Sequence, residues 1–260
     1  MNICMAGALG RMGQRILALA DEDPDFGIGG AFDKPGTEGT ETPAGNSKAA
    51  VTDAQTAIER SDVLIDFTLA SVCMDNVQKA VDAGKAVVLG TTGLSEDQKQ
   101  HIENLSHQVP IVFAPNFSVG VNLLFKLTLD AAKLLGLDYN CEITEIHHNQ
   151  KIDSPSGTAV RLAERAAEGL GLNYDEHAKH GREGDNVGKR PANEIGMHAL
   201  RGGDVAGEHT VSFIGQGERV ELTHKAHNRD NFARGALQAA KFAGNAEPGL
   251  YDMQHVLGLK

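Results

Sequence analysis

The segment NICMAGALGRMGQRILALADED, residues 2–23, joins an apolar run to an apolar-periodic stretch through three glycines. The run 2–6 predicts a short buried strand, and the periodic stretch predicts a helix. Gly7, Gly10 and Gly13 give the turn the spacing G-x-x-G-x-x-G. Glycines let a backbone turn sharply and approach a pyrophosphate, and a helix N-terminus offers N–H groups and the positive end of a dipole. The segment therefore predicts a strand–turn–helix unit that could bind a dinucleotide.

An acid follows at the end of the next predicted strand, residues 27–33. Asp33 comes 20 residues after Gly13, and an acid at that distance can accept hydrogen bonds from adenosine ribose hydroxyls. A tight turn without a ligand is the alternative, because the glycine spacing is not G-x-G-x-x-G. Lys34 could meet the 2′-phosphate of NADP, which Asp33 would repel, or could be a solvated surface lysine. The sequence favours a dinucleotide site and leaves NADH or NADPH as the cofactor.

Strands alternate with helices through the first half of the chain. We expect further strands at 63–68, 86–93 and 110–117, and helices at 71–84 and near 95–107. Apolar strands that alternate with helices are typical of parallel βαβ units. The pattern therefore predicts an α/β fold with a Rossmann-type doubly wound parallel sheet. Residues 34–50 are rich in Gly, Thr, Pro and Ala and predict a loop.

The loops that follow three of these strands should line one crevice, because ligands bind at the carboxyl ends of parallel strands. These loops are residues 66–68, 90–93 and 114–117. Their small, polar and aromatic side chains could hold a nicotinamide ring and its amide. Phe67 or Phe117 taken alone is more often a core residue than a stacking partner.

The pattern changes after Phe117. We expect a helix at 118–136, a strand at 139–148, a helix at 157–170, a polar stretch at 173–192, strands at 194–202, 208–215 and 218–226, and a tail helix at 231–244. Residues 215–217 predict a hairpin turn between the last two strands. Successive strands with helices to one side predict a second, α+β domain.

Residues 145–158 read EIHHNQKIDSPSGT and place three basic side chains within five residues of an acidic chain. His147 and His148 end a predicted strand, so their side chains should point to opposite faces. With Lys151 they could supply a proton donor and positive charge. Metal binding is not expected, because adjacent histidines on a strand diverge and no HExxH motif or third ligand is present.

The same segment predicts an anion site at the start of a helix. Ser154 is expected to cap the helix, and Pro155 suits its first position, where a missing N–H costs nothing. The amides of Ser156, Gly157 and Thr158 would then face a carboxylate. The alternative is an ordinary capped helix after a strand, with incidental basic residues nearby.

The net charge of −11 comes from 24 Lys and Arg against 35 Asp and Glu. It disfavours general attraction to nucleic acid or to an anionic membrane. Cys4, Cys73 and Cys141 form no CxxC pair, which favours a reducing compartment over disulfides or structural zinc. No signal-peptide pattern and no membrane-spanning apolar run is present, so we expect a cytoplasmic protein.

Several segments together resemble the dihydrodipicolinate reductase family, also called 4-hydroxy-tetrahydrodipicolinate reductase. They are GALGRMG, GTTG, APNFSVGVN, EIHHNQKIDSPSGTA, IGMHALRGGDVAGEH and THKAHNRDNFARGAL. The resemblance covers nearly the whole chain, and EIHHNQKIDSPSGTA is highly specific. Two positions depart from the pattern: Lys34 stands where many members carry Arg, and residues 226–229, AHNR, stand where smaller polar residues precede the Arg.

The resemblance implies an NADH- or NADPH-dependent reductase that converts a cyclic imine dicarboxylate to tetrahydrodipicolinate on the diaminopimelate route to lysine. It implies a dinucleotide-binding domain at 1–116 and 229–260. It also implies a second domain at 117–228, with a mixed sheet, that binds substrate and forms a homotetramer. Hinges are expected near Asn116 and residues 227–229.

The matching motifs also imply roles for individual residues. His147 and Lys151 would be the catalytic acid/base pair, and His148, Gly157 and Thr158 would bind substrate. The cofactor-binding residues would be Gly7, Ala8, Leu9, Gly10, Arg11, Met12, Asp33, Lys34, Gly90, Thr91, Thr92, Ala114, Pro115, Asn116 and Phe117. A different nicotinamide-linked reductase of a small anionic substrate, or a non-catalytic NAD(P)H-binding redox sensor, is the alternative. Neither alternative needs HHxxK followed by SPSGT.

Overall fold

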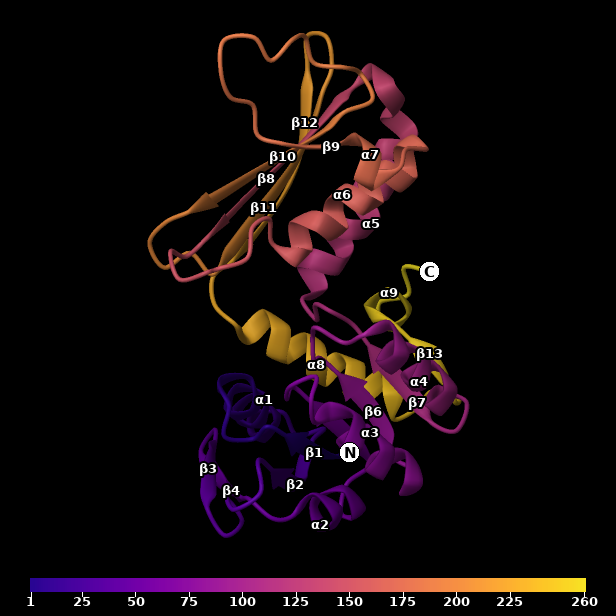
Figure 1. The fold of residues 1–260 in the computed structure, drawn as a ribbon. Coiled ribbons are helices and arrows are strands. Elements are labelled where there is room, and N and C mark those ends of the chain that lie inside the picture. The colour runs from indigo at the N-terminus through magenta and orange to yellow at the C-terminus, as the bar shows by residue number, and fades with distance from the viewer. The chain divides into compact units, whose positions relative to one another are not determined.

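A computed structural model describes residues 1–260, which form two compact units (Figure 1). One unit comprises Met1–Val119 together with Arg229–Lys260, and the other comprises Gly120–Asn228. The C-terminal segment therefore returns to the unit that holds the N-terminus. None of the helices combines the length and the apolar character that a membrane span requires.

A six-stranded parallel sheet forms the centre of the first unit, in the order β13-β7-β6-β5-β1-β2. Its strands are β1 (Asn2–Ala6), β2 (Gly27–Phe32), β5 (Val63–Asp66), β6 (Ala86–Leu89), β7 (Pro110–Phe113) and β13 (Gly249–Tyr251). Strand β1 pairs in parallel with β2 on one side and with β5 on the other, so the order of strands reverses beside β1. The expected doubly wound sheet is confirmed, and the carboxyl ends of its strands share one edge.

Helices cover both faces of this sheet, as burial along β1 shows. Ile3 and Met5 belong to the core that includes α1 and α8, whereas Cys4 and Ala6 belong to the core that includes α2, α3 and α4. Side chains alternate along a strand, so a strand buried on both faces is apolar throughout. The helices are α1 (Arg11–Glu22), α2 (Ala54–Glu59), α3 (Cys73–Asp82), α4 (Glu96–Ser106), α8 (Asp230–Ala243) and α9 (Met253–Val256).

Residues 34–50, expected as a loop, contain an antiparallel hairpin. Its strands are β3 (Glu41–Ala44) and β4 (Ser47–Ala50). Thr42 is buried in this hairpin and donates its hydroxyl to the carbonyl of Ala8 at 3.0 Å. The loop prediction is wrong because small residues here pack against α1, a tertiary contact that composition does not show.

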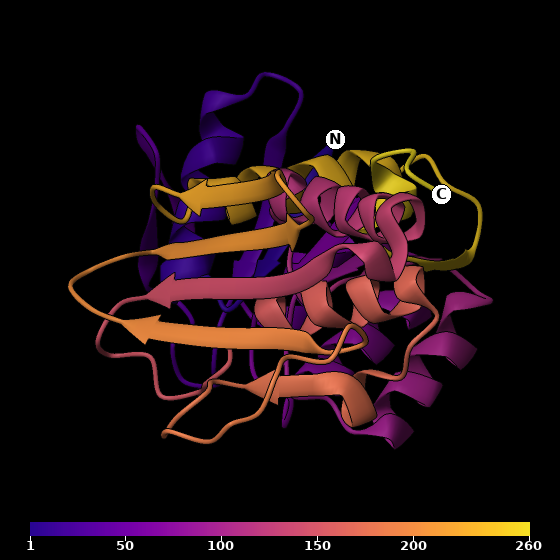
Figure 2. The same cartoon turned by 90° about the horizontal axis from the view of Figure 1, so that it is seen from above.

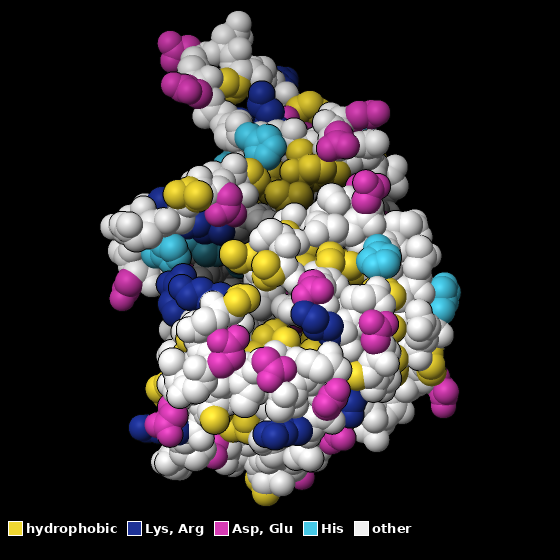
Figure 3. Space-filling view, turned by 60° about the horizontal axis from the view of Figure 1, so that its bottom comes forward, with side chains coloured by type: hydrophobic (Ala, Val, Ile, Leu, Met, Phe, Trp, Pro, Cys, Tyr) yellow, Lys and Arg dark blue, Asp and Glu magenta, His cyan; other side chains and the backbone are white.

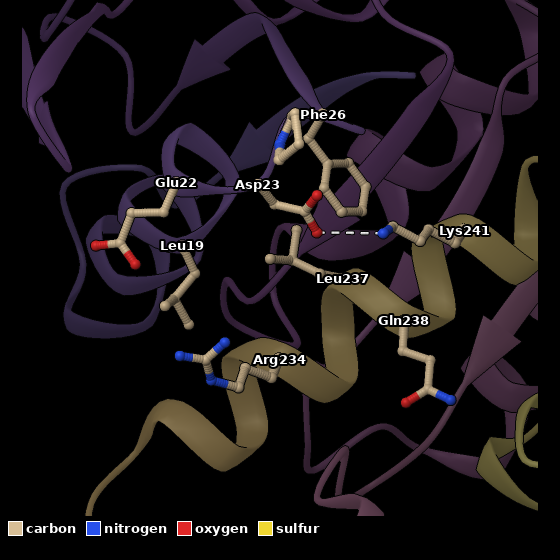
Figure 4. A pocket seen from close by; sticks show the side chains of 9 residues that line it. Leu19, Glu22, Asp23, Phe26, Arg234, Leu237, Gln238 and Lys241 are labelled. Carbon is tan, nitrogen blue, oxygen red and sulfur yellow. Dashed lines mark hydrogen bonds and ion pairs between the residues drawn. The ribbon is translucent and has the colours of Figure 1, made fainter.

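Ion pairs fasten α8 to the body of the first unit. Arg15 donates two hydrogen bonds to Asp230, at 2.5 and 2.7 Å. Lys241 pairs with Asp23 at 3.1 Å (Figure 4) and also with Asp25 at 2.7 Å. A pocket of about 430 Å³ lies between α1 and α8 and is lined by Leu19, Glu22, Asp23, Pro24, Phe26, Arg234, Leu237, Gln238 and Lys241. Ion pairs as exposed as these contribute little to stability, because water screens them.

A five-stranded mixed sheet forms the centre of the second unit, in the order β12-β11-β8-β10-β9 (Figure 2). Strand β8 pairs in parallel with β10 and antiparallel with β11. The strands are β8 (Asn140–His147), β9 (Ala178–His180), β10 (Ile195–Arg201), β11 (Gly207–Ile214) and β12 (Arg219–Ala226). The expected α+β domain with a mixed sheet is confirmed, including the antiparallel pair β11 and β12.

Burial alternates along β8, so one side of the sheet faces the helices. Cys141, Ile143, Glu145 and His147 are buried, and the residues between them are half-buried. The first two belong to a core shared with α5 and α6. The helices of this unit are α5 (Val119–Leu135), the 3₁₀ helix η1 (Gly136–Asp138), α6 (Gly157–Leu170) and α7 (Tyr174–His177). Glu145 and His147 therefore lie on the helix-facing side of the sheet, where a charged side chain needs partners.

Candidate active site

The glycine turn after β1 leaves no room for side chains at Gly7 and Gly13. Gly7 has φ +77°, and its N–H and that of Ala8 donate to the carbonyl of Phe32 at 3.0 and 3.1 Å. A Cβ on Gly13 would lie 2.2 Å from the carbonyl oxygen of Gly7. Gly10 caps α1 without a side-chain hydrogen bond. The turn thus leaves the N-terminus of α1 open to a ligand, as pyrophosphate binding requires.

Asp33 is held against this turn. Its Oδ2 accepts the N–H of Leu9 at 2.9 Å, and its Oδ1 accepts the N–H of Lys34 at 2.8 Å. A carboxylate has about four acceptor sites, so each oxygen can still accept a ribose hydroxyl. Lys34 is exposed beside it. The acid is therefore fixed in position before any cofactor binds.

We expect the substitution Asp33→Ala to raise the ratio of kcat/KM for NADPH to kcat/KM for NADH by about tenfold. The variant loses hydrogen bonds from ribose hydroxyls to a charged acceptor, which contribute about 1.5–3 kcal/mol, and it no longer repels a 2′-phosphate. Steady-state kinetics with both cofactors measure the ratio.

Asp62→Ala is a matched control for this prediction. Asp62 also accepts a backbone N–H, that of Asn2 at 2.7 Å, but it lies before β5 and so at the other edge of the sheet. The control should leave the ratio unchanged. The same ratio in Asp33→Ala as in the unsubstituted enzyme would remove Asp33 from the ribose site.

A buried acid joins the loops after β5 and β6. Asp66 is fully buried and accepts four hydrogen bonds: two from Thr68, at 2.9 and 2.7 Å, one from Asn76 at 2.8 Å and one from Thr91 at 3.0 Å. Burial raises the pKa of Asp66, and the donors oppose that rise. Asp66 therefore positions two strand-end loops relative to each other without itself being exposed to a ligand.

The expected cofactor residues differ in exposure. The rings of Phe67 and Phe117 lie 5.5 Å apart, and Phe117 is only 2% exposed. Phe117 could therefore contact a cofactor through its backbone but not through its ring. The exposed residues of this set are Gly10, Arg11, Lys34, Thr92 and Pro115. The half-buried residues are Gly7, Leu9, Met12, Asp33, Gly90 and Asn116. The buried residues are Ala8, Thr91, Ala114 and Phe117. All of them follow strands of the parallel sheet at its carboxyl edge.

In the second unit, His147 is bound to a buried carboxylate. Its Nδ1 lies 2.6 Å from Oε2 of Glu145, which is 1% exposed. Arg201 donates to both oxygens of Glu145 at 2.8 Å, and the N–H of Ser156 donates to Oε1 at 3.0 Å. Burial alone would raise the pKa of Glu145, but Arg201, His147 and Ser156 together hold it below its usual value. The carboxylate is therefore ionised at neutral pH.

The helix after this strand spans the expected residues 157–170, but its N-cap lies two residues later than expected. Ser156, not Ser154, is the N-cap of α6, and its hydroxyl accepts the N–H of Ala159 at 3.2 Å. The expected cap at Ser154 and the expected free amide of Ser156 are wrong, because the amide of Ser156 is needed by the buried Glu145. Gly157 and Thr158 become the first two helical residues. A Cβ on Gly157 would meet no atom within 4 Å, so a ligand can approach its backbone.

Lys151 and His148 lie beside this helix start. Lys151 is half-buried and pairs with Asp153 at 2.8 Å. The N–H of His148 donates to the carbonyl of Val205 at 2.8 Å, while its Nδ1 is buried and has no hydrogen-bond partner. The structure thus groups Lys151 with His147, which Glu145 links to the start of α6 and so to Gly157 and Thr158, whereas the buried Nδ1 of His148 makes no hydrogen bond to this group.

A third histidine, His209, lies within this cluster. Its ring packs edge-on against that of His147, with 5.1 Å between centroids, and its Nε2 lies 3.0 Å from the hydroxyl of Ser156. Burial lowers the pKa of His209 to about 3. His209 is therefore neutral at physiological pH and acts as a packing and hydrogen-bonding partner.

We expect the free energy of unfolding to fall as the pH drops below about 6.5. Between pH 6.5 and 3 the unfolded chain protonates His209 and the folded chain does not, so acid favours unfolding. The loss approaches about 1.4 kcal/mol per pH unit for this group. Urea unfolding at pH 7.5 and 5.5 measures it. His209→Gln should flatten the dependence, and an unchanged slope in that variant would contradict the assignment.

Sequence reasoning missed Glu145, Arg201 and His209. Glu145 stands two residues before His147 on a predicted strand, so strand alternation could have placed both on one face. Arg201 and His209 reach the cluster only through pairing: Arg201 lies opposite His147, and His209 lies opposite Glu145. That register does not follow from local sequence.

The cluster combines two cations, Lys151 and Arg201, with two carboxylates, Asp153 and Glu145. On the face drawn in Figure 3, Asp and Glu side chains are dispersed among Lys and Arg rather than gathered in one patch. The structure contains no group of three or more His, Cys, Asp or Glu side chains that could hold a metal ion.

Comparisons with known proteins reach both units. The model of a family described as dihydrodipicolinate reductase, N-terminus, matches residues 1–117, and the model described as dihydrodipicolinate reductase, C-terminus, matches residues 120–257. The chain is 46% identical to the 4-hydroxy-tetrahydrodipicolinate reductase of Citrifermentans bemidjiense, over 100% of both chains. It is 47% identical to the protein of the same name from Geobacter sulfurreducens, over 100% of this chain and 99% of that one.

Solved structures share the fold. A dipicolinate-bound dihydrodipicolinate reductase from a Paenisporosarcina species aligns with a TM-score of 0.78 at 23% identity, over 97% of each chain. A probable dehydrogenase from Thermotoga maritima aligns with a TM-score of 0.62 at 11% identity, over 98% of this chain and 92% of that one. At these identities the structural matches support the architecture alone.

Proposed function

Because this chain belongs to the dihydrodipicolinate reductase family, we propose that it reduces 4-hydroxy-tetrahydrodipicolinate, or its dehydrated form dihydrodipicolinate, to tetrahydrodipicolinate. The chain is an NAD(P)H-dependent oxidoreductase of the diaminopimelate route to lysine. The observation that carries the proposal is the cluster of His147, Lys151 and the start of α6, which combines a proton donor with a site for carboxylates.

The first unit fits a dinucleotide. A side chain at Gly7 or Gly13 would be strained or would clash, and Asp33 is fixed beside the turn with acceptor sites to spare. The pyrophosphate would be held by residues 7–12, the adenosine ribose by Asp33 and Lys34, and the nicotinamide end by the loops at 90–92 and 114–117. The bound cofactor supplies the hydride.

The second unit would bind the substrate through its two carboxylates. Lys151 and His148 offer positive charge or N–H donors, and Gly157 and Thr158 offer the N-terminus of a 14-residue helix. Anions are stabilised at helix N-termini by backbone N–H groups and by the helix dipole. Two separate anion-binding elements suit a dicarboxylate better than a monoanion.

His147 would deliver the proton that reduction requires. Hydride addition at a conjugated carbon moves electrons toward the ring nitrogen and leaves an enamine, which must be protonated. Burial lowers the pKa of His147, but a bound dianion favours the protonated ring. Lys151 is the alternative donor, or the electrostatic partner that offsets substrate charge.

Assembly and location form part of the same proposal. We infer a homotetramer built through the second unit, because the side of its sheet away from α5 and α6 carries half-buried residues that no helix of that unit covers. We infer a cytoplasmic enzyme, which three free and buried cysteines support.

The decisive experiment follows NADH and NADPH oxidation with and without freshly generated cyclic substrate. Oxidation that depends on the substrate and yields tetrahydrodipicolinate supports the proposal. Oxidation with aspartate semialdehyde or another small anion instead would favour a different reductase. Cofactor binding without any turnover would favour a redox sensor.

A further inference from the structure

We propose that Glu145, clamped by Arg201, is a positioning residue that fixes the Nδ1–H tautomer of His147 and leaves Nε2 as the atom that carries the transferred proton. This inference rests on the proposed role of His147 as proton donor. It assigns Glu145 a role in orienting His147, which the sequence motifs alone do not assign.

The first step is the set of partners around Glu145. Oε2 lies 2.6 Å from Nδ1 of His147 and accepts from Arg201 at 2.8 Å, while Oε1 accepts from Arg201 at 2.8 Å and from the N–H of Ser156 at 3.0 Å. Three of these four contacts come from unambiguous donors. An ionised carboxylate has no hydrogen to donate, so the hydrogen shared with His147 must be on Nδ1.

The second step is the rigidity of the clamp. Arg201 also donates to the carbonyl of Leu200 at 2.6 Å and to the carbonyl of Asp153 at 2.7 Å. Asp153 belongs to the loop that carries Lys151. A planar guanidinium with these partners cannot rotate without breaking several bonds. Arg201 therefore fixes the carboxylate and the loop of the second basic residue at once.

The third step concerns the opposite nitrogen of the ring. A Cβ on Gly207 would lie 3.0 Å from Nε2 of His147, and Gly207 has φ +152°. No side chain is present there to cover the nitrogen. Nδ1 is thus committed to Glu145, while Nε2 is the nitrogen that can exchange a proton with a ligand.

The charges around the ring make Glu145 the group that favours protonation. His147 faces Glu145 on its own strand, Lys151 on the following loop, Arg201 at the end of β10 and the neutral His209 on β11. Burial lowers the pKa of His147, Glu145 raises it, and Lys151 and Arg201 lower it. Without the carboxylate, the remaining effects on the ring, which are burial and the charges of Lys151 and Arg201, would all lower the pKa of His147.

Glu145→Gln tests the inference, because it keeps the shape of the side chain and removes its charge. We expect kcat at pH 8 to fall by about 10- to 100-fold, less than the roughly 10²- to 10⁴-fold loss of a positioned proton donor, because His147 itself remains. The pH at which kcat falls to half its maximum should move down by about one unit, since the donor must be protonated and now loses its proton more easily. The substrate-free affinity for NADH should not change.

Glu142→Gln is the matched control. Glu142 lies on the same strand but on its other face, where it accepts from Arg190 at 2.8 Å and contacts His198 at 2.7 Å. It is thus a second clamped carboxylate that does not touch His147. A merely structural loss should appear in both variants, whereas the shift of the pH profile should appear in Glu145→Gln alone.

Two further measurements separate the possible outcomes. In the His147→Ala background, Glu145→Gln should change kcat by less than about threefold, because the residues act as one unit. Nitrogen-15 NMR of the unsubstituted enzyme should show that the neutral His147 ring is protonated on Nδ1. This measurement does not depend on whether any variant folds. Protonation on Nε2, or an unshifted pH profile in Glu145→Gln, overturns the inference. Full activity in His147→Ala would instead overturn the proposed role of His147 as proton donor, while leaving the reductase activity itself in place.

Discussion

Replacing His147 with Ala is expected to lower kcat by about 10²- to 10⁴-fold, the range for a positioned general acid. The affinity for NADH should stay within about twofold, because the glycine turn and Asp33 belong to the first unit and His147 to the second. Stopped-flow or steady-state absorbance at the nicotinamide band gives kcat, and quenching of protein or cofactor fluorescence gives the affinity.

The fold should tolerate this substitution. After removal of the ring, Glu145 keeps two hydrogen bonds from Arg201 and one from Ser156, so its charge stays compensated. His148→Ala is the neighbouring control and should affect KM for the substrate more than kcat. Parallel losses of turnover, cofactor affinity and thermal stability in His147→Ala would identify a structural role and contradict the assignment.

The elements with strong periodicity were predictable. Helix α6 spans Gly157–Leu170, as its apolar spacing predicts, and it ends at Gly171, which adopts the left-handed conformation at φ +69°. Apolar runs and the glycine turn likewise predict the doubly wound sheet, because a strand buried on both faces has no polar side. Each of these features is determined by residues that are close together in the sequence, such as those along one strand, one helix face or one turn.

The parts that could not be predicted depend on contacts distant in sequence. Strand β13 has only three residues, and it exists because it pairs with β7. The short helix α2 follows a cap at Asp53, but its six residues are too few to show a clear period. The N-cap of α6 is Ser156 and not the expected Ser154, because the buried Glu145 requires the N–H of Ser156 as a donor. The candidate site could thus be located from the motif HHxxK, while its supporting residues needed the strand register.

Replacing Lys151 with Ala is expected to lower kcat/KM for the dicarboxylate by about 10²- to 10³-fold, the range for loss of one preorganised donor to developing or bound charge. Lys151 pairs with Asp153 at 2.8 Å. An incoming carboxylate must therefore compete with Asp153 for the ammonium group. The loss should appear in both KM and kcat, because one cation both binds the carboxylate and offsets the charge around the reacting ring.

Two variants distinguish charge from shape at this position. Lys151→Arg keeps the charge but replaces a compact ammonium with a planar fork, so it should recover binding more fully than turnover. Asp153→Asn removes the competing carboxylate and should lower KM for the substrate, because the backbone carbonyl of Asp153 still accepts from Arg201 and holds the loop. A higher salt concentration should reduce the difference in kcat/KM between Lys151→Ala and the unsubstituted enzyme, because salt partly screens the attraction between Lys151 and the substrate carboxylate. Near-normal kinetics in Lys151→Ala at low salt would remove Lys151 from the substrate site and leave the helix N-terminus of α6 as its anion-binding element.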